Sequence, residues 1–328
     1  MNEIMEILQL TVMHKPVWMW GAFLSVVLVL LVFDLGILHR TDKEISVKQS
    51  LKLSAFYICM GLLFGLFVWK ELGAQSAQEY YTGFLIEKTL SMDNIFVISL
   101  VFSYFAIPRQ YQYRVLFWGI IGVIVLRALL IGIGATLVQE FHWVLYIFAA
   151  FLIFTGIKML KGNDEEHDIS KNPVIKFFKK YMRTTDELHG NKFFVRKVDT
   201  NTNKRALFAT PLFLALVTVE FVDVIFAVDS VPAIFAITTD EYIVYTSNIF
   251  AILGLRALYF ALAAMLHRFA YLKYSLSAVL IFIGGKVFAP LVFDIEKVPA
   301  SISLSVTVAI LAAGVIYSLH MTKQGKVK

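Results

Sequence analysis

The sequence predicts an all-α, polytopic membrane protein with nine transmembrane helices that include two inverted three-helix repeats. Of its 328 residues, 59% are hydrophobic and only 16% are charged, and the mean hydropathy is +0.72. A soluble chain has about 25% charged residues, so this composition excludes a soluble globular protein. The single cysteine, Cys59, excludes a disulfide framework. Residues 1–328 are therefore expected to form one transmembrane domain.

Nine segments are apolar enough to cross a bilayer as helices, since each crossing needs roughly 20 residues with a rise of about 1.5 Å per residue. The first segment is expected to be retained. The N-terminus has Glu3 and Glu6 and no basic residue before Lys15, which is unlike a cleaved signal peptide. The nine segments run approximately over residues 17–38, 51–69, 80–105, 114–138, 143–160, 207–237, 243–266, 271–291 and 302–319.

The distribution of basic residues predicts how these segments are oriented. Residues 161–205 form a polar loop with eleven Lys or Arg and seven Asp or Glu. Placing this loop in the cytoplasm puts 22 Lys or Arg inside and three, Lys15, Lys70 and Lys297, outside. Because cytoplasmic loops carry such an excess, the N-terminus is expected outside and the C-terminus inside. The basic loop is then an orientation signal, which we favour over nucleic-acid or lipid recognition.

Matching stretches indicate an internal repeat, with copies over residues 80–160 and 207–291. Each copy has three predicted helices, an odd number, so the two copies have opposite orientations. Inverted repeats are typical of secondary transporters, whose substrate sites lie near the midplane between the copies. The matches join Glu87 to Asp223, Asp93 to Asp229, Arg127 to Arg256, and residues 152–158 to 280–286.

Acidic residues inside the predicted crossings indicate a cation site. On insertion scales an Asp at the centre of a membrane helix costs roughly 2.5–3.5 kcal/mol, so these side chains need a partner. A purely structural network with three central cations is the alternative, but it leaves an excess of carboxylates. Neutral oxygen ligands are offered by Asn94, Ser230 and Asn248, although hydrogen bonding between helices explains these residues equally well. The acids are Asp34, Glu87, Asp93, Glu220, Asp223 and Asp229, and the cations are Lys88, Arg127 and Arg256.

A proline predicts an irregular backbone near one of these acids. Pro232 follows Asp229 by three positions and leaves the Val228 carbonyl without its helical donor. The segment 207–237 is also longer than one straight crossing requires. We expect a helix break near Asp229 that turns its carboxylate inward, with a simple proline kink as the alternative.

The ligand chemistry only partly narrows the choice of metal ion. Carboxylate, amide and carbonyl oxygens suit Mg²⁺, Ca²⁺ or Mn²⁺, whereas softer metals favour His or Cys. Met92 offers a thioether that would help Mn²⁺ compete, although Met is more often a packing residue. The chain lacks the zinc-protease, nucleophile-elbow and Walker signatures. We therefore expect no enzyme activity, no cofactor and no ATP-driven pump.

Three long motifs resemble one family. Residues 84–97, 219–236 and 246–259, together with Phe193-Phe-Val-Arg-Lys197 in the polar loop, closely resemble the TerC/Alx family, and the likeness to its Alx branch covers nearly the whole chain. The resemblance implies a multi-pass protein of the bacterial inner membrane within the LysE transporter superfamily, linked to tellurium resistance and understood as an Mn²⁺ exporter. Its acidic motif residues correspond to Glu87, Asp93, Glu220, Asp223 and Asp229, with Asp34 as the acid of the first helix.

The combined prediction is a secondary transporter that exports Mn²⁺ by alternating access between the repeats. Asp93 and Asp229 are expected to be the paired central ligands, which Glu87 and Asp223 complete or gate. Arg127 and Arg256 are expected to hold the acids in place when the ion has left. Mn²⁺ as substrate and membrane lipid are the expected partners, without nucleic acid, and homo-oligomers or membrane partners stay open.

The alternative function is an accessory membrane protein that supports metalation of exported enzymes or tellurium resistance. Direct handling of tellurium oxyanions fits poorly, because carboxylates repel anions.

Export is expected to be coupled to proton entry. Moving a divalent cation out against 100 mV, inside negative, costs roughly 4.6 kcal/mol, and two protons entering per Mn²⁺ would cancel the charge movement. Glu220 is the candidate carrier, because its repeat counterpart is Phe84 and it lies one helical turn before Asp223. The structural alternative pairs Glu220 with Arg127 or Arg256.

Overall fold

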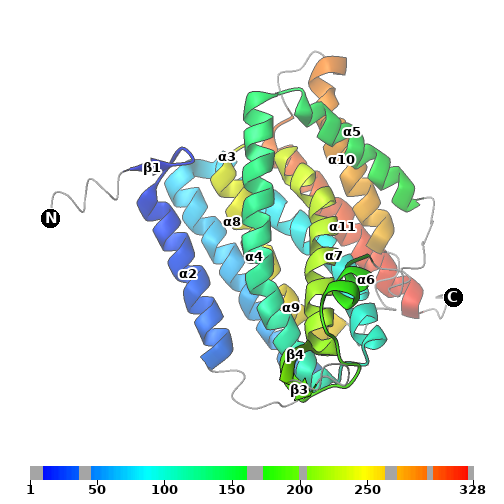
Figure 1. The fold of residues 1–328 in the computed structure, drawn as a ribbon. Coiled ribbons are helices and arrows are strands. Elements are labelled where there is room, and N and C mark those ends of the chain that lie inside the picture. The colour runs from blue at the N-terminus through cyan, green and yellow to red at the C-terminus, as the bar shows by residue number, and fades with distance from the viewer. Residues whose placement is uncertain are drawn as a thin grey trace.

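The computed structural model is a bundle of apolar helices with a small appendage at one end (Figure 1). It describes residues 10–36, 46–160, 173–198, 205–262, 272–293 and 298–323. Within these ranges the side chains at 34–36, 92, 93, 173, 174, 179, 229, 256, 262, 322 and 323 lie outside the description. The roles expected of the side chains of Asp34, Asp93, Asp229 and Arg256 therefore stay predictions.

Up to residue 160, the described residues form a short hairpin and four helices. Strands β1 (Thr11–Val12) and β2 (Lys15–Pro16) pair antiparallel. The helices that follow are α2 (Val17–Gly36), α3 (Val47–Tyr104), α4 (Arg109–Glu140) and α5 (Val144–Leu160).

Helix α3 contains both predicted segments, 51–69 and 80–105, as two helical arms that meet at a kink. The kink is at Gly73, whose φ of 88° and ψ of 176° are not helical, and the arms pack on each other, since the Tyr81 hydroxyl donates to the Leu62 carbonyl at 3.0 Å. Glycine reaches such positive φ values without steric cost. A Cβ at Gly73 would meet nothing within 4 Å, so conformation and not space requires glycine here.

After residue 210 the described part of the chain forms five helices. These are α7 (Pro211–Phe235), α8 (Glu241–Leu253), α9 (Leu255–Leu262), α10 (Leu272–Phe293) and α11 (Ala300–Lys323). The segment predicted over 243–266 is thus divided at Gly254 into α8 and α9.

Helix α7 differs from its prediction in where it begins and in the effect of its internal proline. It begins after Thr210, with Pro211 at its first positions where the missing N–H is harmless. Residues 205–209 form a strand instead of the start of a crossing. The break expected near Asp229 is wrong, because α7 continues through that residue to Phe235 with Pro232 inside it. Membrane helices tolerate such a proline when neighbouring groups satisfy the freed carbonyl.

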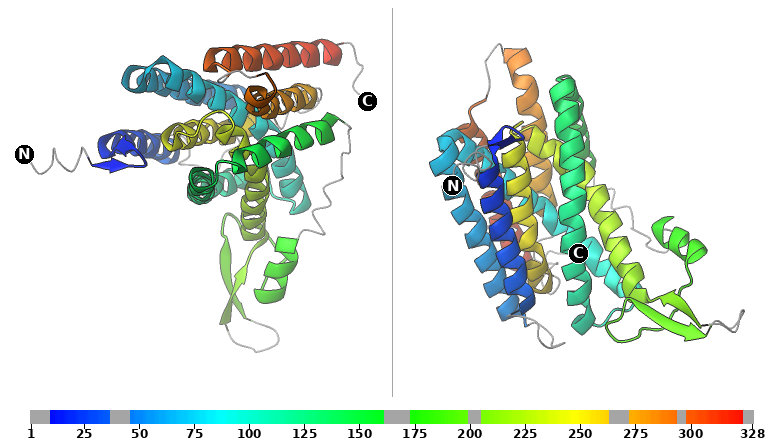
Figure 2. Two further views of the ribbon diagram at one scale, coloured as in Figure 1. Left: turned by 90° about the horizontal axis from the view of Figure 1, so that it is seen from above. Right: turned by 60° about the vertical axis from the view of Figure 1, so that its left-hand side comes forward.

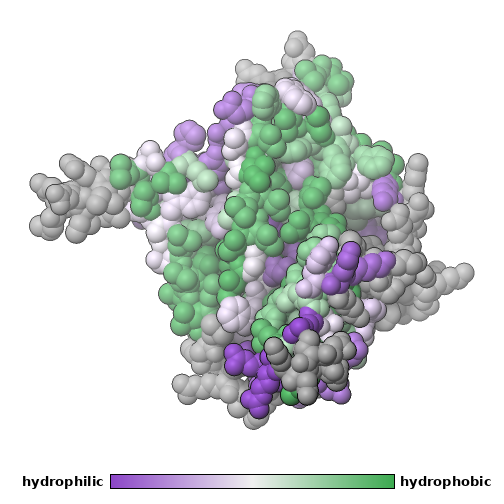
Figure 3. All heavy atoms as spheres, in the orientation of Figure 1, coloured by the Kyte–Doolittle hydropathy of each residue, from purple (hydrophilic) through white to green (hydrophobic). Residues whose placement is uncertain are grey.

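The helices agree with a polytopic, mainly α-helical membrane protein. In the described part of the chain five helices are long and apolar enough to span a membrane, namely α3, α4, α7, α10 and α11, while α2 and α5 contain shorter apolar stretches. Large apolar side chains such as Val29, Val125 and Phe154 face outward. Figure 3 shows apolar side chains over α2 and α4 and hydrophilic ones gathered near the appendage. Exposed apolar surface of this extent fits lipid contact.

Helices α5 and α10 pack through two glycines with reciprocal contacts. A Cβ at Gly156 would lie 2.7 Å from Ile281 Cγ1, and a Cβ at Gly284 would lie 2.8 Å from Ile153 Cγ1. The Ser277 hydroxyl also donates to the Gly156 carbonyl. In the predicted repeat, Gly156 corresponds to Gly284 and Ile153 to Ile281, so the same contact occurs twice with the helices exchanged.

An aromatic cluster holds the first part of α3 against α8. The rings of Phe64 and Phe250 have centroids 4.5 Å apart, and both belong to a buried cluster that also includes Phe23 of α2. The Tyr80 hydroxyl donates to the Gly61 carbonyl at 2.9 Å across the bend of α3. These contacts fix the helices that carry the polar residues described below.

The appendage consists of α6 (Pro173–Tyr181), β3 (Phe194–Val198) and β4 (Arg205–Ala209). Strands β3 and β4 pair antiparallel in a register that places Phe194 opposite Ala209. The Thr210 hydroxyl, at the start of α7, donates to the Lys192 carbonyl at 2.8 Å and ties the hairpin to the bundle. The hairpin and α6 stand out to one side of the helices (Figure 2).

Candidate cation site

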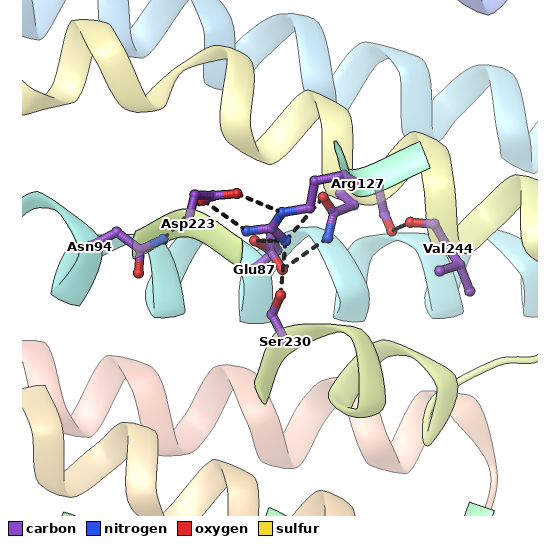
Figure 4. Close-up of polar contacts among 8 residues, drawn as sticks. Glu87, Asn94, Arg127, Asp223, Ser230 and Val244 are labelled. Carbon is purple, nitrogen blue, oxygen red and sulfur yellow. Dashed lines mark hydrogen bonds and ion pairs between the residues drawn. The ribbon is translucent and has the colours of Figure 1, made fainter. Parts of the chain in front are cut away.

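Among the described side chains, one buried arginine joins acids from the two halves of the chain (Figure 4). Arg127 of α4 is 1% exposed. Its Nη1 donates to Glu87 Oε1 of α3 at 2.7 Å. Its Nε and Nη2 donate to Asp223 Oδ2 and Oδ1 of α7, each at 3.2 Å. The guanidinium therefore binds Asp223 with two parallel hydrogen bonds, the arrangement that makes arginine–carboxylate pairs strong.

Neutral side chains complete the environment of the guanidinium. Arg127 Nη1 also donates to Ser230 Oγ at 2.8 Å and to Asn248 Oδ1 at 3.2 Å. The amide of Asn248 in turn donates to Glu87 Oε2 at 3.0 Å. Asn94 Nδ2 lies 3.5 Å from Asp223 Oδ1, at the limit of hydrogen bonding. Helices α3, α4, α7 and α8 thus each contribute polar groups to one buried cluster.

The close approach of α3 and α8 has a local cause in the sequence. A Cβ at Gly83 would lie 2.9 Å from the Ser247 hydroxyl, so glycine lets the two helices approach one turn away from Glu87. Asn248, the next residue of α8, is then within reach of the Glu87 carboxylate. A larger residue at position 83 would separate the helices that form the cluster.

The charges of the cluster favour a cation. Two carboxylates and one guanidinium leave one negative charge on Glu87, Asp223 and Arg127, and all three residues are buried. Burying an ion pair costs desolvation energy that good geometry has to offset. An arginine guanidinium provides hydrogen-bond donors but no acceptor. The position between the two acids is therefore one that a positively charged group occupies.

Glu220 occupies a notch of α4 and makes no described hydrogen bond to this cluster. A Cβ at Gly122 would collide with both of its carboxylate oxygens, and a Cβ at Gly119 would lie 3.5 Å from Oε1. Both oxygens are buried, and no side chain that the structure describes hydrogen-bonds to them. The expected alternative, a pair between Glu220 and Arg127, is therefore absent from the described contacts. An unpartnered buried carboxyl is costly, which makes this residue a candidate for proton binding.

Lys88 was expected to pair with the acids, but it contacts a helix end instead. Its Nζ donates to the Ala251 carbonyl at 3.0 Å, close to where α8 ends at Leu253. A Cβ at Gly254 would lie 2.7 Å from the same Nζ. A cation at a helix C-terminus is favourable because the last carbonyls carry partial negative charge. Lys88 therefore stabilises the division between α8 and α9.

The described side chains do not by themselves form a metal centre. No three His, Cys, Asp or Glu side chains in the described part of the chain are grouped to hold a metal ion. Glu87 and Asp223 are held apart by the guanidinium between them. The expected ligands Asp93 and Asp229, the acid Asp34 and the cation Arg256 lie outside the described side chains, so their places in the site stay predictions.

Sequence reasoning missed the glycines that shape this site. Gly83 and Gly122 make room for Ser247 and Glu220, respectively. In the sequence they are two among 18 glycines. Their position on the same helices as the charged residues is the only signal that would have singled them out.

The fold and the site define a polytopic helical membrane protein with a buried cluster of carboxylates around an arginine. The chain belongs to the integral membrane protein TerC family, whose model matches residues 72–326. The family resemblance that the sequence motifs indicated is thereby confirmed.

Relatives similar over almost their full length carry different names. An uncharacterized membrane protein of Rickettsia bellii is 50% identical over 300 residues, which cover 92% of this chain and 96% of the relative. A Salmonella typhi protein whose name proposes a membrane-bound redox modulator, Alx, is 43% identical over 315 residues, or 93% of this chain and 95% of the relative. Among solved structures there is no match to the chain.

Proposed function

We propose that the chain is a secondary transporter that exports Mn²⁺ from the bacterial cytoplasm. The observation that carries this proposal is the buried guanidinium of Arg127, bound by Glu87 at 2.7 Å and by Asp223 at 3.2 Å. Intramembrane carboxylates are costly and usually mark ion paths. Here an internal cation neutralises carboxylates from both halves of the chain, and a transported cation would take its place.

The proposed architecture is nine crossings with two inverted repeats, residues 80–160 and 207–291, around the loop 161–205. The reciprocal contacts of Gly156 and Gly284 support this, because two copies related by a twofold axis make each contact twice. The contact of Arg127 with Glu87 and Asp223, which are repeat counterparts, supports it as well. The proposed orientation in the inner membrane, with the N-terminus in the periplasm and the C-terminus in the cytoplasm, is supported by the basic loop.

In the proposed cycle, Arg127 and the metal ion alternate as partners of the acids. When Mn²⁺ enters from the cytoplasm, Asp93 and Asp229 bind it, and Glu87 and Asp223 exchange the guanidinium for the ion. Rocking of one repeat against the other opens the site outward. After release, the guanidinium returns to Glu87 and Asp223, as in the arrangement of Figure 4. The bound arginine then keeps Mn²⁺ from re-entering the site.

Proton entry supplies the energy in this proposal. Export of Mn²⁺ against 100 mV requires roughly 4.6 kcal/mol. Glu220 is the proposed carrier because its carboxylate is buried in the notch of Gly122, separate from Arg127. It can therefore bind or release a proton without breaking the ion pairs of the metal site.

The identity of the ion rests on ligand type and family. Carboxylate and amide oxygens suit Mn²⁺, Mg²⁺ and Ca²⁺ alike, and the TerC/Alx resemblance favours Mn²⁺. The relative from Salmonella typhi is named for redox modulation, but a dithiol couple needs two cysteines and this sequence has only Cys59. An accessory role in metalation or tellurium resistance stays the alternative. It predicts metal binding without turnover.

Purified protein in proteoliposomes distinguishes the two functions. A Mn²⁺-sensitive dye is enclosed in the vesicles. We expect Mn²⁺ uptake through protein molecules whose cytoplasmic side faces outward. This uptake should be faster when the vesicle interior is more acidic than the outside, because protons then move in the opposite direction to Mn²⁺. Asp223→Asn should abolish this uptake, while Lys52→Gln, which changes an exposed residue, should not. Metal binding with uptake no faster than in protein-free vesicles would favour the accessory role.

A further inference from the structure

We propose that α6 is an interfacial helix that binds the headgroups of anionic lipids. The nine residues Pro173–Tyr181 include three lysines and no acidic residue. Ile175 is buried, and Phe178 on the same face packs on the bundle. Lys176, Phe177, Lys180 and Tyr181 lie together on the opposite face and are exposed. This inference is independent of which ion the protein transports.

Contacts with α7 fix the level at which α6 lies. The rings of Phe178 and Phe213 meet edge to face with centroids 5.8 Å apart. Phe213 is the third residue of α7, a helix long and apolar enough to span the membrane. The packing therefore holds α6 beside the end of a candidate membrane span, where the hydrocarbon core gives way to headgroups.

The position of α6 beside the bundle supports a location over lipid. Viewed along α4, in the left panel of Figure 2, α6 and the β3–β4 hairpin extend sideways from the helices. An element that extends sideways at the level of a helix end overlies the surrounding bilayer. An element directly below the bundle would instead face water.

The exposed face combines the two chemistries that a membrane interface offers. Phe177 is 57% exposed and Tyr181 is 66% exposed, and their ring centroids are 4.7 Å apart. The Lys180 ammonium lies 5.4 Å from the centre of the Tyr181 ring. Aromatic rings favour the headgroup level of a bilayer, and lysines extend their charge toward phosphate while their methylenes stay in apolar surroundings.

Charge complementarity selects a lipid surface as the occupant. Basic helices with aromatic residues bind at the surface of bilayers that contain anionic lipid. The cytoplasmic leaflet is negatively charged and attracts basic segments beside membrane helices. A second copy of this chain would bring a second set of lysines against the first, which is unfavourable at short range.

Fluorescence of the full-length protein in nanodiscs tests this proposal. An environment-sensitive fluorophore is attached to a Phe177→Cys variant in which the native cysteine is replaced by serine. In discs with 30% phosphatidylglycerol, we expect emission at shorter wavelength and at least twofold quenching by lipids brominated near the headgroup. In pure phosphatidylcholine both effects should decrease. Because both leaflets of a disc share one composition, the result does not depend on the proposed orientation.

Two charge variants provide the matched controls. Lys176→Gln/Lys180→Gln should abolish the difference between anionic and neutral discs. Lys48→Gln/Lys52→Gln removes the same charge from exposed positions of α3 and should preserve it. Equal quenching in both lipid compositions, no quenching in either, or an equal loss in both double variants would overturn the proposal. Quenching that depends on protein concentration in place of lipid would assign the face to a second copy.

Discussion

Replacement of Arg127 by methionine should destabilise the protein more than any other single change in the cluster. Methionine preserves much of the side-chain volume but removes the ion pairs to Glu87 and Asp223. Both carboxylates then stay buried without a counter-charge. Removing one partner of a buried ion pair costs roughly 3–5 kcal/mol. At about 2–4 °C per kcal/mol for a large domain, the apparent Tm should fall by roughly 6–20 °C.

The assay is thermal unfolding in detergent, followed by fluorescence-detected size exclusion. Lys52→Met, which removes an exposed cation from α3, is the control and should shift the Tm little. Arg127→Lys should be intermediate, because lysine keeps the charge but cannot bind Asp223 through two parallel hydrogen bonds. Adding Asp223→Asn to Arg127→Met should restore part of the loss, since one uncompensated charge is removed.

Added Mn²⁺ separates the transport proposal from a purely structural arginine. Without the guanidinium, the acids attract a cation more strongly, so Mn²⁺ should raise the Tm of Arg127→Met more than that of the native protein. Full stability of Arg127→Met in the absence of metal would refute the ionic cluster. If Mn²⁺ raises the Tm of Arg127→Met no more than it raises the Tm of the native protein, exchange between arginine and metal is refuted.

Three further predictions concern packing, topology and coupling. Gly284→Ala should lower stability because its Cβ would lie 2.6 Å from a backbone carbonyl of α5. Gly285→Ala should be neutral, because its Cβ would have nothing within 4 Å. Equal stability of the two variants would contradict the helix packing. In a variant without the native cysteine, a cysteine at Thr239 should react with an impermeant thiol reagent from the periplasm and one at Ser170 only from the cytoplasm. Labelling of Ser170→Cys from outside would reverse the orientation. Gly122→Ala should displace the proposed proton carrier and reduce the protons moved per Mn²⁺ in vesicles with a pH dye; unchanged coupling would argue against that carboxyl.

The charged centre was predictable because few arrangements of charge are tolerated in a membrane. Arg127, Glu87 and Asp223 occur in repeated motifs within apolar segments, and such groups must pair or bind ions. The sequence did not show which acids the arginine would contact or that Lys88 would instead bind a backbone carbonyl at the end of α8. These outcomes depend on helix rotation and register, which tertiary packing determines.

Element boundaries were less predictable for backbone reasons. The polar residues 70–79 separate two predicted crossings, and the structure joins these crossings by a kink at Gly73 with helix on both sides instead of by a long loop. The apolar residues 207–209 resembled the start of a crossing, yet they form β4, and Pro211 marks the helix start. Pro232 was expected to break α7, but a proline leaves one unpaired carbonyl and does not by itself end a membrane helix.

Transport of radioactive Mn²⁺ by the purified protein tests the central claim most directly. Inside-out proteoliposomes with a proton gradient should accumulate Mn²⁺ above its external concentration, and collapse of the gradient should release it. Asp93→Asn and Asp229→Asn should each abolish accumulation while the variants insert normally. Native accumulation in both variants would contradict the assigned site, and no accumulation by the native protein would contradict Mn²⁺ export itself.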